Sequence, residues 1–121
     1  MEHTQIQFRA EFTINEGKIE EYKKLVEETN KDVEANEPNT ITYQFYLNKD
    51  QTKCLVHETF TSSEAALAHI DSVTSQTIFV KILNVSRMNK LEVYGNPSDE
   101  LQKVLTRHSP QTYNTFAGFS R

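Results

Sequence analysis

Several features that would define a functional class are missing from this sequence. It has one cysteine, Cys54, so no internal disulfide can form, and its four histidines have no spacing typical of a zinc site. No stretch approaches the ~20 consecutive apolar residues of a membrane-spanning helix, and no cationic region followed by an apolar run opens the chain. We therefore expect no bound metal, no membrane span and a reducing, cytoplasmic setting.

An excess of basic residues is also missing. The formal net charge is -4, and acidic residues alternate with Lys and Arg instead of forming a block. The sequence contains no glycine-rich phosphate loop, no GxSxG and no paired-cysteine motif. With 3 Gly, 3 Pro and 36% hydrophobic residues, it has the composition of an ordinary globular chain. We expect one domain over residues 1–121, no nucleic-acid partner and no nucleotide or other cofactor.

The N-terminal half shows first a strand period and then a helix period. Every second residue from Ile6 to Ile14 is apolar, which predicts a strand with one buried face. Apolar residues then recur at three- and four-residue steps through 18–37, which predicts an amphipathic helix that ends near Pro38. The β-branched and aromatic runs 40–47 and 53–60, separated by the turn NKDQT, predict a hairpin.

A second helical region follows the hairpin. Thr61 and Glu64 have the spacing of a capping box, so we expect a helix that begins at Thr61 or Ser62. Residues 71–75 are poor in helix formers and predict an interruption. The apolar pattern then resumes in QTIFVKILNV, which predicts that the helix continues beyond the break.

The C-terminal third begins with another strand pattern at 87–95. Asn96 as a cap and Pro97 at the first helical position predict a short helix, so a C-terminal helix and arm should occupy 96–121. The aromatic tail from 111 predicts a last short strand or an extended arm. The order β-α-β-β-α-β is that of an α+β, ferredoxin-like fold, an antiparallel sheet with helices on one face.

The second face of such a sheet requires a cover. In the predicted hairpin, Tyr43, Phe45, Tyr46 and Leu47 place large apolar side chains on both faces. An exposed aromatic face is most simply covered by a second copy of the same sheet. We therefore expect a homodimer whose sheets face each other.

Glu58 and His69 are the candidate functional pair. By the two-residue period, Glu58 shares a strand face with Val56 and Phe60 and should point under the helices. His69 lies at the edge of the apolar stripe of the next helix, so the two side chains can approach each other. One interpretation is structural, a histidine that joins helix to strand. The other is a small-molecule pocket in which the pair removes a phenolic proton.

Four aromatic side chains could form the walls of that pocket. They are Tyr43, Phe45, Phe8 and Phe79. Flat aromatic walls suit a small apolar or aromatic ligand, whereas the default interpretation of aromatic residues at strand and helix spacing is an ordinary core. Both interpretations stay open at this stage.

The run HETFTSSEAALAH, residues 57–69, resembles the antibiotic biosynthesis monooxygenase family in its carboxylate, its aromatic residue two positions later, its helix cap and its helical histidine. The helix GKIEEYKKLVEE and the later LEVYGNPSDEL and FAGFSR resemble the same family. The resemblance implies the dimeric α+β barrel superfamily.

The resemblance also implies a function, a cofactor-independent monooxygenase for a small aromatic or quinol-type substrate. In that scheme His69 is the base and Glu58 orients it. The alternative is a non-enzymatic module that binds a small ligand, or haem with His69 as the axial ligand.

Overall fold

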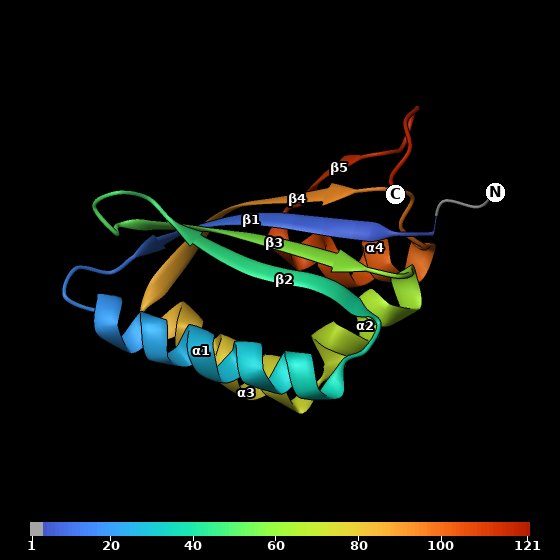
Figure 1. The fold of residues 1–121 in the computed structure, drawn as a ribbon. Helices are drawn as coiled ribbons and strands as arrows, with labels where there is room; N and C mark the ends of the chain where they lie inside the picture. The colour runs from blue at the N-terminus through green and yellow to red at the C-terminus, as the bar shows by residue number, and fades with distance from the viewer. Residues whose placement is uncertain (1–3) are drawn as a thin grey trace.

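The computed structural model describes residues 4–121, which form one sheet with the helices against one of its faces (Figure 1). The elements are β1 Ile6–Ile14, α1 Ile19–Asn36, β2 Thr40–Leu47, β3 Lys53–Phe60, α2 Ser63–Asp71, α3 Val73–Asn84, β4 Ser86–Tyr94, α4 Asp99–Leu105, a 3₁₀ turn Thr106–His108 and β5 Gln111–Tyr113. The strand order is β2-β3-β1-β4-β5. The first four strands are antiparallel, and β5 adds a strand parallel to β4. The predicted α+β, ferredoxin-like fold is confirmed.

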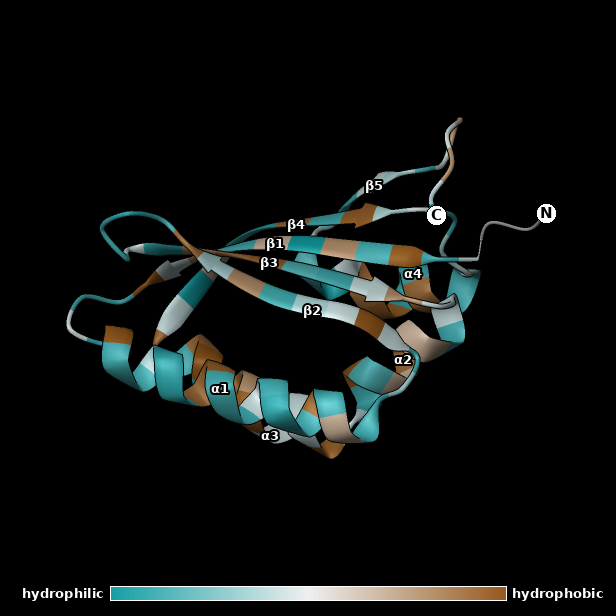
Figure 2. Cartoon of the chain, in the orientation of Figure 1, coloured by the Kyte–Doolittle hydropathy of each residue, from teal (hydrophilic) through white to brown (hydrophobic). Residues whose placement is uncertain are grey.

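The core lies between the sheet and the helices. The residues of β1 alternate between buried and more exposed, as the strand period predicts. On the helix side, Phe8 packs edge-on against Phe60, with ring centroids 5.1 Å apart. The helix α1 buries Tyr22, Thr29 and Val33, and Figure 2 shows hydrophilic residues on much of its outer surface. The inner face of β3 therefore lies in a closed, mostly apolar layer.

Serine residues cap α2, α3 and α4, and two predicted caps are wrong. The helix α2 is capped by Ser62, whose side chain accepts a hydrogen bond from the Ala65 amide, so the Thr61–Glu64 capping box does not form. The interruption after α2 occurs as predicted, with Ser72 as the cap of α3. The cap of α4 is Ser98 instead of Asn96, because the chain is still non-helical through Pro97.

The other face of the sheet carries no helix (Figure 1). Its side chains include exposed Tyr46 on β2 and exposed Leu55 on β3. From the central strand β1, the Arg9 guanidinium lies 5.0 Å from the ring centre of Tyr94 on β4, which stacks on Tyr113 of β5. This open face thus combines aromatic, apolar and charged side chains. Within residues 4–121, no helix is both long and apolar enough to cross a bilayer.

Candidate acid–histidine site

Three ionisable side chains meet under the sheet near the C-terminal end of α1. His69 Nδ1 lies 2.7 Å from Glu37 Oε1, and His69 Nε2 lies 3.2 Å from Glu58 Oε1. The side chains of His69, Glu37 and Glu58 are 10%, 15% and 12% exposed. The predicted approach of Glu58 to His69 is therefore observed. The third member, Glu37, was not predicted.

Each member occupies its place for a local reason. The alternation along β3 turns Glu58 toward the helices beside Phe60. Glu37 is the residue at which α1 ends, and its Oε1 also accepts a hydrogen bond from Thr40 Oγ1 at 2.9 Å. Because proline disfavours helical geometry in the residue before it, Pro38 ends α1 where Glu37 reaches His69. A carboxylate directly before a helix-ending proline was the one sequence signal for this residue.

The break between α2 and α3 anchors the backbone of His69. The hydroxyl of Ser72 donates to the His69 carbonyl at 2.8 Å, and the hydroxyl of Ser75 donates to the same oxygen at 2.6 Å. The backbone N–H of Ser72 also donates to this oxygen, at 3.2 Å, so three donors meet the carbonyl at the C-terminal end of α2. The histidine is thus held at both its backbone and its ring.

The electrostatic surroundings favour the charged form of His69. Burial disfavours the imidazolium, but the hydrogen bond and the charge of Glu58, joined by those of Glu37, outweigh burial and raise the pKa of His69 to about 9. At neutral pH both ring nitrogens are therefore protonated and each donates to a carboxylate. The three groups together carry one net negative charge, and His69 has no free lone pair.

Tyr43 and Phe60 flank the imidazole. The ring centroids of Tyr43 and His69 are 5.4 Å apart, and those of Phe60 and His69 are 5.3 Å apart. The Tyr43 hydroxyl lies 3.4 Å from Thr29 Oγ1. Burial, followed by the negative charge of Glu58, raises the pKa of Tyr43 above its usual range, so this side chain stays a neutral phenol.

The four predicted wall residues divide into two groups. Tyr43 contacts His69 directly, and Phe45 packs on Tyr43 with ring centroids 4.9 Å apart. Phe8 lies one ring further away, against Phe60, whereas Phe79 packs on Phe12 at 6.3 Å. Tyr43 therefore contacts the triad formed by Glu37, Glu58 and His69. Phe45 contacts Tyr43, and Phe8 contacts Phe60, so one aromatic ring separates each of them from His69. The structure shows no contact of Phe79 with the triad.

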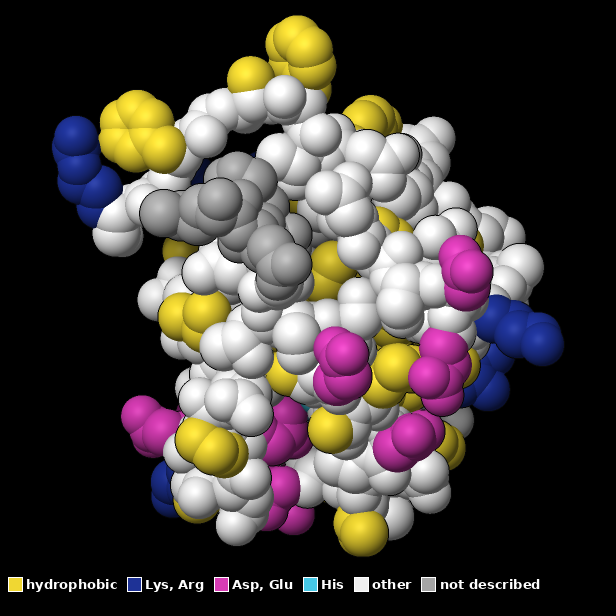
Figure 3. All heavy atoms as spheres, turned by 90° about the vertical axis from the view of Figure 1, so that its right-hand side faces the viewer, with side chains coloured by type: hydrophobic (Ala, Val, Ile, Leu, Met, Phe, Trp, Pro, Cys, Tyr) yellow, Lys and Arg dark blue, Asp and Glu magenta, His cyan; other side chains and the backbone are white. Residues whose placement is uncertain are grey.

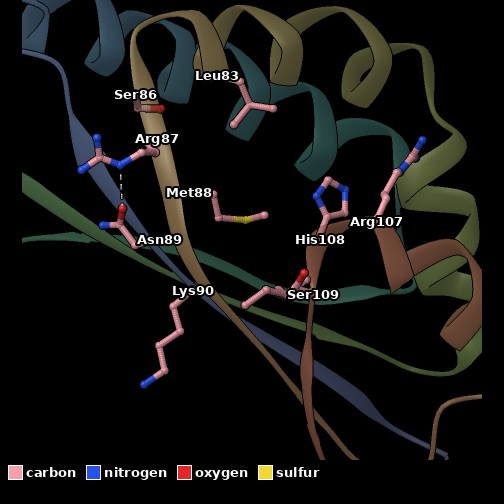
Figure 4. A pocket seen from close by; sticks show the side chains of 10 residues that line it. Leu83, Ser86, Arg87, Met88, Asn89, Lys90, Arg107, His108 and Ser109 are labelled. Carbon is pink, nitrogen blue, oxygen red and sulfur yellow. Dashed lines mark hydrogen bonds between the residues drawn. The ribbon is translucent and has the colours of Figure 1, made fainter.

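A separate hollow of about 500 Å³ lies beside β4, between the end of α3 and the 3₁₀ turn (Figure 4). Leu83 and Met88 extend toward it, whereas Arg87 and Lys90 point away on the other side of the strand (Figure 4). His108 lies on its far wall, where burial and then the charge of Arg107 lower the pKa of its imidazole. None of the predicted site residues lines this hollow.

A metal ion does not match the acid–histidine site. Among the described residues, no group of three or more His, Cys, Asp or Glu side chains is arranged to hold one. Both nitrogens of His69 already face carboxylate oxygens, so binding of zinc or haem iron would require breaking one of these bonds.

Comparison with known proteins assigns the chain to a family. Residues 7–80 match the sequence profile described as antibiotic biosynthesis monooxygenase. The chain belongs to this family. The matched segment extends from β1 into α3 and contains Glu37, Glu58 and His69. No curated protein matches the chain.

Solved structures share the fold. MupZ from Pseudomonas fluorescens is 23% identical, with a TM-score of 0.83, over 98% of this chain and 96% of MupZ. A protein from Nitrosomonas europaea, named for the antibiotic biosynthesis monooxygenase family, is 15% identical over 79% of this chain and 93% of its own, with a TM-score of 0.70. Protein SO0527 from Shewanella oneidensis is 22% identical over 76% of this chain and 88% of its own, with a TM-score of 0.64. At these identities the likeness concerns the fold.

Proposed function

We propose that the protein is a cofactor-independent monooxygenase that acts on a small aromatic or quinol-type substrate beside Glu58 and His69. The observation that carries this proposal is the buried set of Glu37, His69 and Glu58 with aromatic rings packed on its imidazole. Such a set can accept a proton from a phenol while water is excluded. Tyr43 supplies a flat wall and a neutral hydroxyl, and Phe45, Phe8 and Phe79 remain the proposed apolar lining.

The proposed reaction begins with removal of the phenolic proton. Because His69 is already protonated at neutral pH, the lone pair that takes the proton belongs to the Glu58 carboxylate, and His69 holds that carboxylate in place. The deprotonated substrate is electron-rich at carbon and reduces dioxygen itself. A C–O bond forms between that carbon and one oxygen atom, the O–O bond breaks, and the second oxygen leaves as water with two hydrogens from the substrate. The substrate is thus the source of electrons, and the protein supplies proton transfer and a shaped, dry site.

Oxygen uptake with a panel of quinols tests the proposal. We expect uptake by the native protein, and a loss of at least ~100-fold in Glu58→Gln, the range for removal of a general base. Tyr46→Phe is a matched control because it removes a hydroxyl on the open face, away from the triad. Absence of uptake with every quinol, or full activity in Glu58→Gln, would reject the assignment.

Non-enzymatic ligand binding is the second candidate, and one observation favours it. Both nitrogens of His69 are satisfied by carboxylates, as a purely structural histidine requires. In that case quinols would bind, measured by calorimetry, without oxygen uptake. Haem binding would give a Soret band, and it would require His69 to break its hydrogen bond with Glu37 or with Glu58.

We also propose that two copies pair through their open sheet faces. Tyr46 and Leu55 are 47% and 45% exposed on this face of the sheet, which no helix covers. Sedimentation equilibrium should give a dimer at micromolar concentration. Leu55→Asp should shift it toward monomer, whereas Val73→Asp, at an exposed position on α3, should not. A native protein that stays monomeric would reject the pairing.

Two further expectations belong to this proposal. Residues 1–121 act as one domain, with α4, the 3₁₀ turn and the arm as its C-terminal addition. The protein acts in the cytoplasm, where its single buried cysteine, Cys54, stays a free thiol.

A further inference from the structure

The hollow beside β4 is not used by the proposed function. Its volume of about 500 Å³ falls within the range of about 300–1,000 Å³ that is typical of small-molecule sites. It lies between the end of α3, β4 and the 3₁₀ turn, and none of Glu37, Glu58 and His69 lines it (Figure 4). A ligand in this hollow would therefore leave the acid–histidine site open to a substrate.

A β-bulge in β4 gives the hollow an apolar floor. In the pairing of β4 with β1 the register shifts between Glu11 and Phe12, so β4 has one extra residue at this point. An uninterrupted strand points residues three positions apart to opposite faces, but here Met88 and Leu91 both line the hollow. Leu83, 38% exposed near the end of α3, adds a third apolar side chain. The floor can therefore cover the apolar part of a ligand.

The wall of the hollow formed by the 3₁₀ turn is cationic. Arg107 and His108 are consecutive on this turn, and the described residues that line the hollow include no Asp or Glu. No carboxylate of residues 4–121 forms an ion pair with Arg107. The whole chain has a net charge of -4, and Figure 3 shows Asp and Glu side chains gathered on one face of the molecule. The hollow departs from this acidic balance, and the guanidinium of Arg107 can bind an anion there.

The charge of this wall matches a single negative charge. Burial and then the charge of Arg107 lower the pKa of His108, so its imidazole is neutral at neutral pH. Arg87 and Lys90 point away from the hollow (Figure 4), and Lys90 pairs with Glu92 at 3.2 Å. Among the described lining residues, Arg107 thus remains as the cation for a ligand head group. A carboxylate accepts two parallel hydrogen bonds from a guanidinium, and a neutral imidazole can donate a third.

We propose that this hollow binds a small amphipathic monocarboxylate whose head group lies between Arg107 and His108. Its apolar tail lies on the floor formed by Leu83, Met88 and Leu91. The floor stabilises the tail by removing it from water, and the guanidinium orients the head group. An aliphatic acid of medium length has both parts. This binding is independent of the reaction proposed at Glu58.

NMR titration of the full-length chain with octanoate tests the proposal. Octanoate at millimolar concentration should shift the amide resonances of Leu83, Met88 and His108 and leave those of Tyr43 and His69 unchanged. Two comparison ligands separate the parts of octanoate: 1-octanol has the tail without the charge, and acetate has the charge without the tail. Each should bind at least ~10-fold more weakly than octanoate.

Two pairs of variants locate the binding. Arg107→Gln should weaken octanoate binding at least ~10-fold, whereas Lys103→Gln, which removes the same charge from α4 outside the hollow, should not. Leu83→Asp should also weaken binding, because it places a negative charge in the hollow. Val80→Asp is its matched control, since Val80 is 53% exposed on the same helix and does not line the hollow.

Four results would overturn the proposal. They are an absence of shifts at millimolar octanoate, shifts centred on Tyr43 and His69, equal binding of octanoate and 1-octanol, and equal losses in Arg107→Gln and Lys103→Gln. None of these measurements depends on quinol oxidation. A protein that takes up no oxygen with any quinol would therefore reject the function proposed above and leave this site standing.

Discussion

The charge on His69 should make the stability of the protein fall as the pH rises above neutral. Its pKa is about 9 in the folded chain, against a model-peptide value of 6.5. The folded state therefore binds this proton more tightly than the unfolded chain does. The contribution is fully present below about pH 6.5 and is lost as the pH rises through about 9.

The size of the effect follows from the two pKa values. A difference of one in pKa is worth about 1.4 kcal/mol, so the difference between 6.5 and about 9 corresponds to about 3 kcal/mol. The side chain of His69 is 10% exposed, so solvent screens little of this energy. Against a typical total stability of about 5–15 kcal/mol, such a loss is large.

Urea denaturation between pH 6 and pH 10 measures this pH-dependent loss of stability. The free energy of unfolding of the native protein should exceed that of His69→Gln by the most near pH 6.5, and the difference should shrink by about 3 kcal/mol by pH 10. His57→Gln is the matched variant, because it removes a histidine from the open face, outside the group formed by Glu37, Glu58 and His69. A constant offset between the native protein and His69→Gln at every pH would refute a buried imidazolium.

Three other changes follow from the contacts. Glu37→Gln removes one of the two charges that hold the His69 proton, so the His69 pKa, followed by NMR, should fall toward its ordinary value; an unchanged pKa would contradict this. Tyr22→Phe should change the urea midpoint little or raise it, since the buried Tyr22 hydroxyl has no hydrogen-bond partner in the described chain; a loss above about 2 kcal/mol would reveal a partner. Ser62→Ala should cost about 1 kcal/mol in unfolding free energy and Thr61→Ala less, because Ser62 alone caps α2; equal losses would argue against that cap.

The sequence predicts the elements of this fold because their periods are unambiguous. The alternation over Ile6–Ile14 and the helical spacing before Pro38 each favour a single structure, and the structure has both. Helix starts are less predictable. Thr61 and Ser62 are both good caps by type, and the choice between them depends on where the backbone leaves β3.

The candidate site was predictable in part for the same reason. Strand parity places Glu58 under the helices, and helical spacing places His69 at the edge of the buried stripe, so the sequence predicts their meeting. Glu37 lies 32 residues before His69, and no local period connects the end of one helix with the face of another. Its contact depends on how α1 and α2 meet over the sheet, which is a tertiary property. The protonation state of His69 was missed together with Glu37. A histidine beside one carboxylate suggests a neutral imidazole that acts as a base, whereas two carboxylates stabilise the protonated imidazolium.

On the proposed function, this change from one carboxylate to two would alter which form of a substrate the site accepts. With Glu37, His69 and Glu58 together carrying one net negative charge in a buried layer, a phenolate would add a second negative charge where little water screens it. A neutral phenol adds no charge. It can transfer its proton to Glu58 while the negative charge that forms on the phenol oxygen is delocalised to carbon and then to dioxygen. On the proposed function, the substrate therefore enters as the neutral quinol and is ionised only inside the site. On the same proposal, Glu37 would contribute to this selection through His69, because its charge helps to keep His69 protonated and so sets the charge beside the substrate.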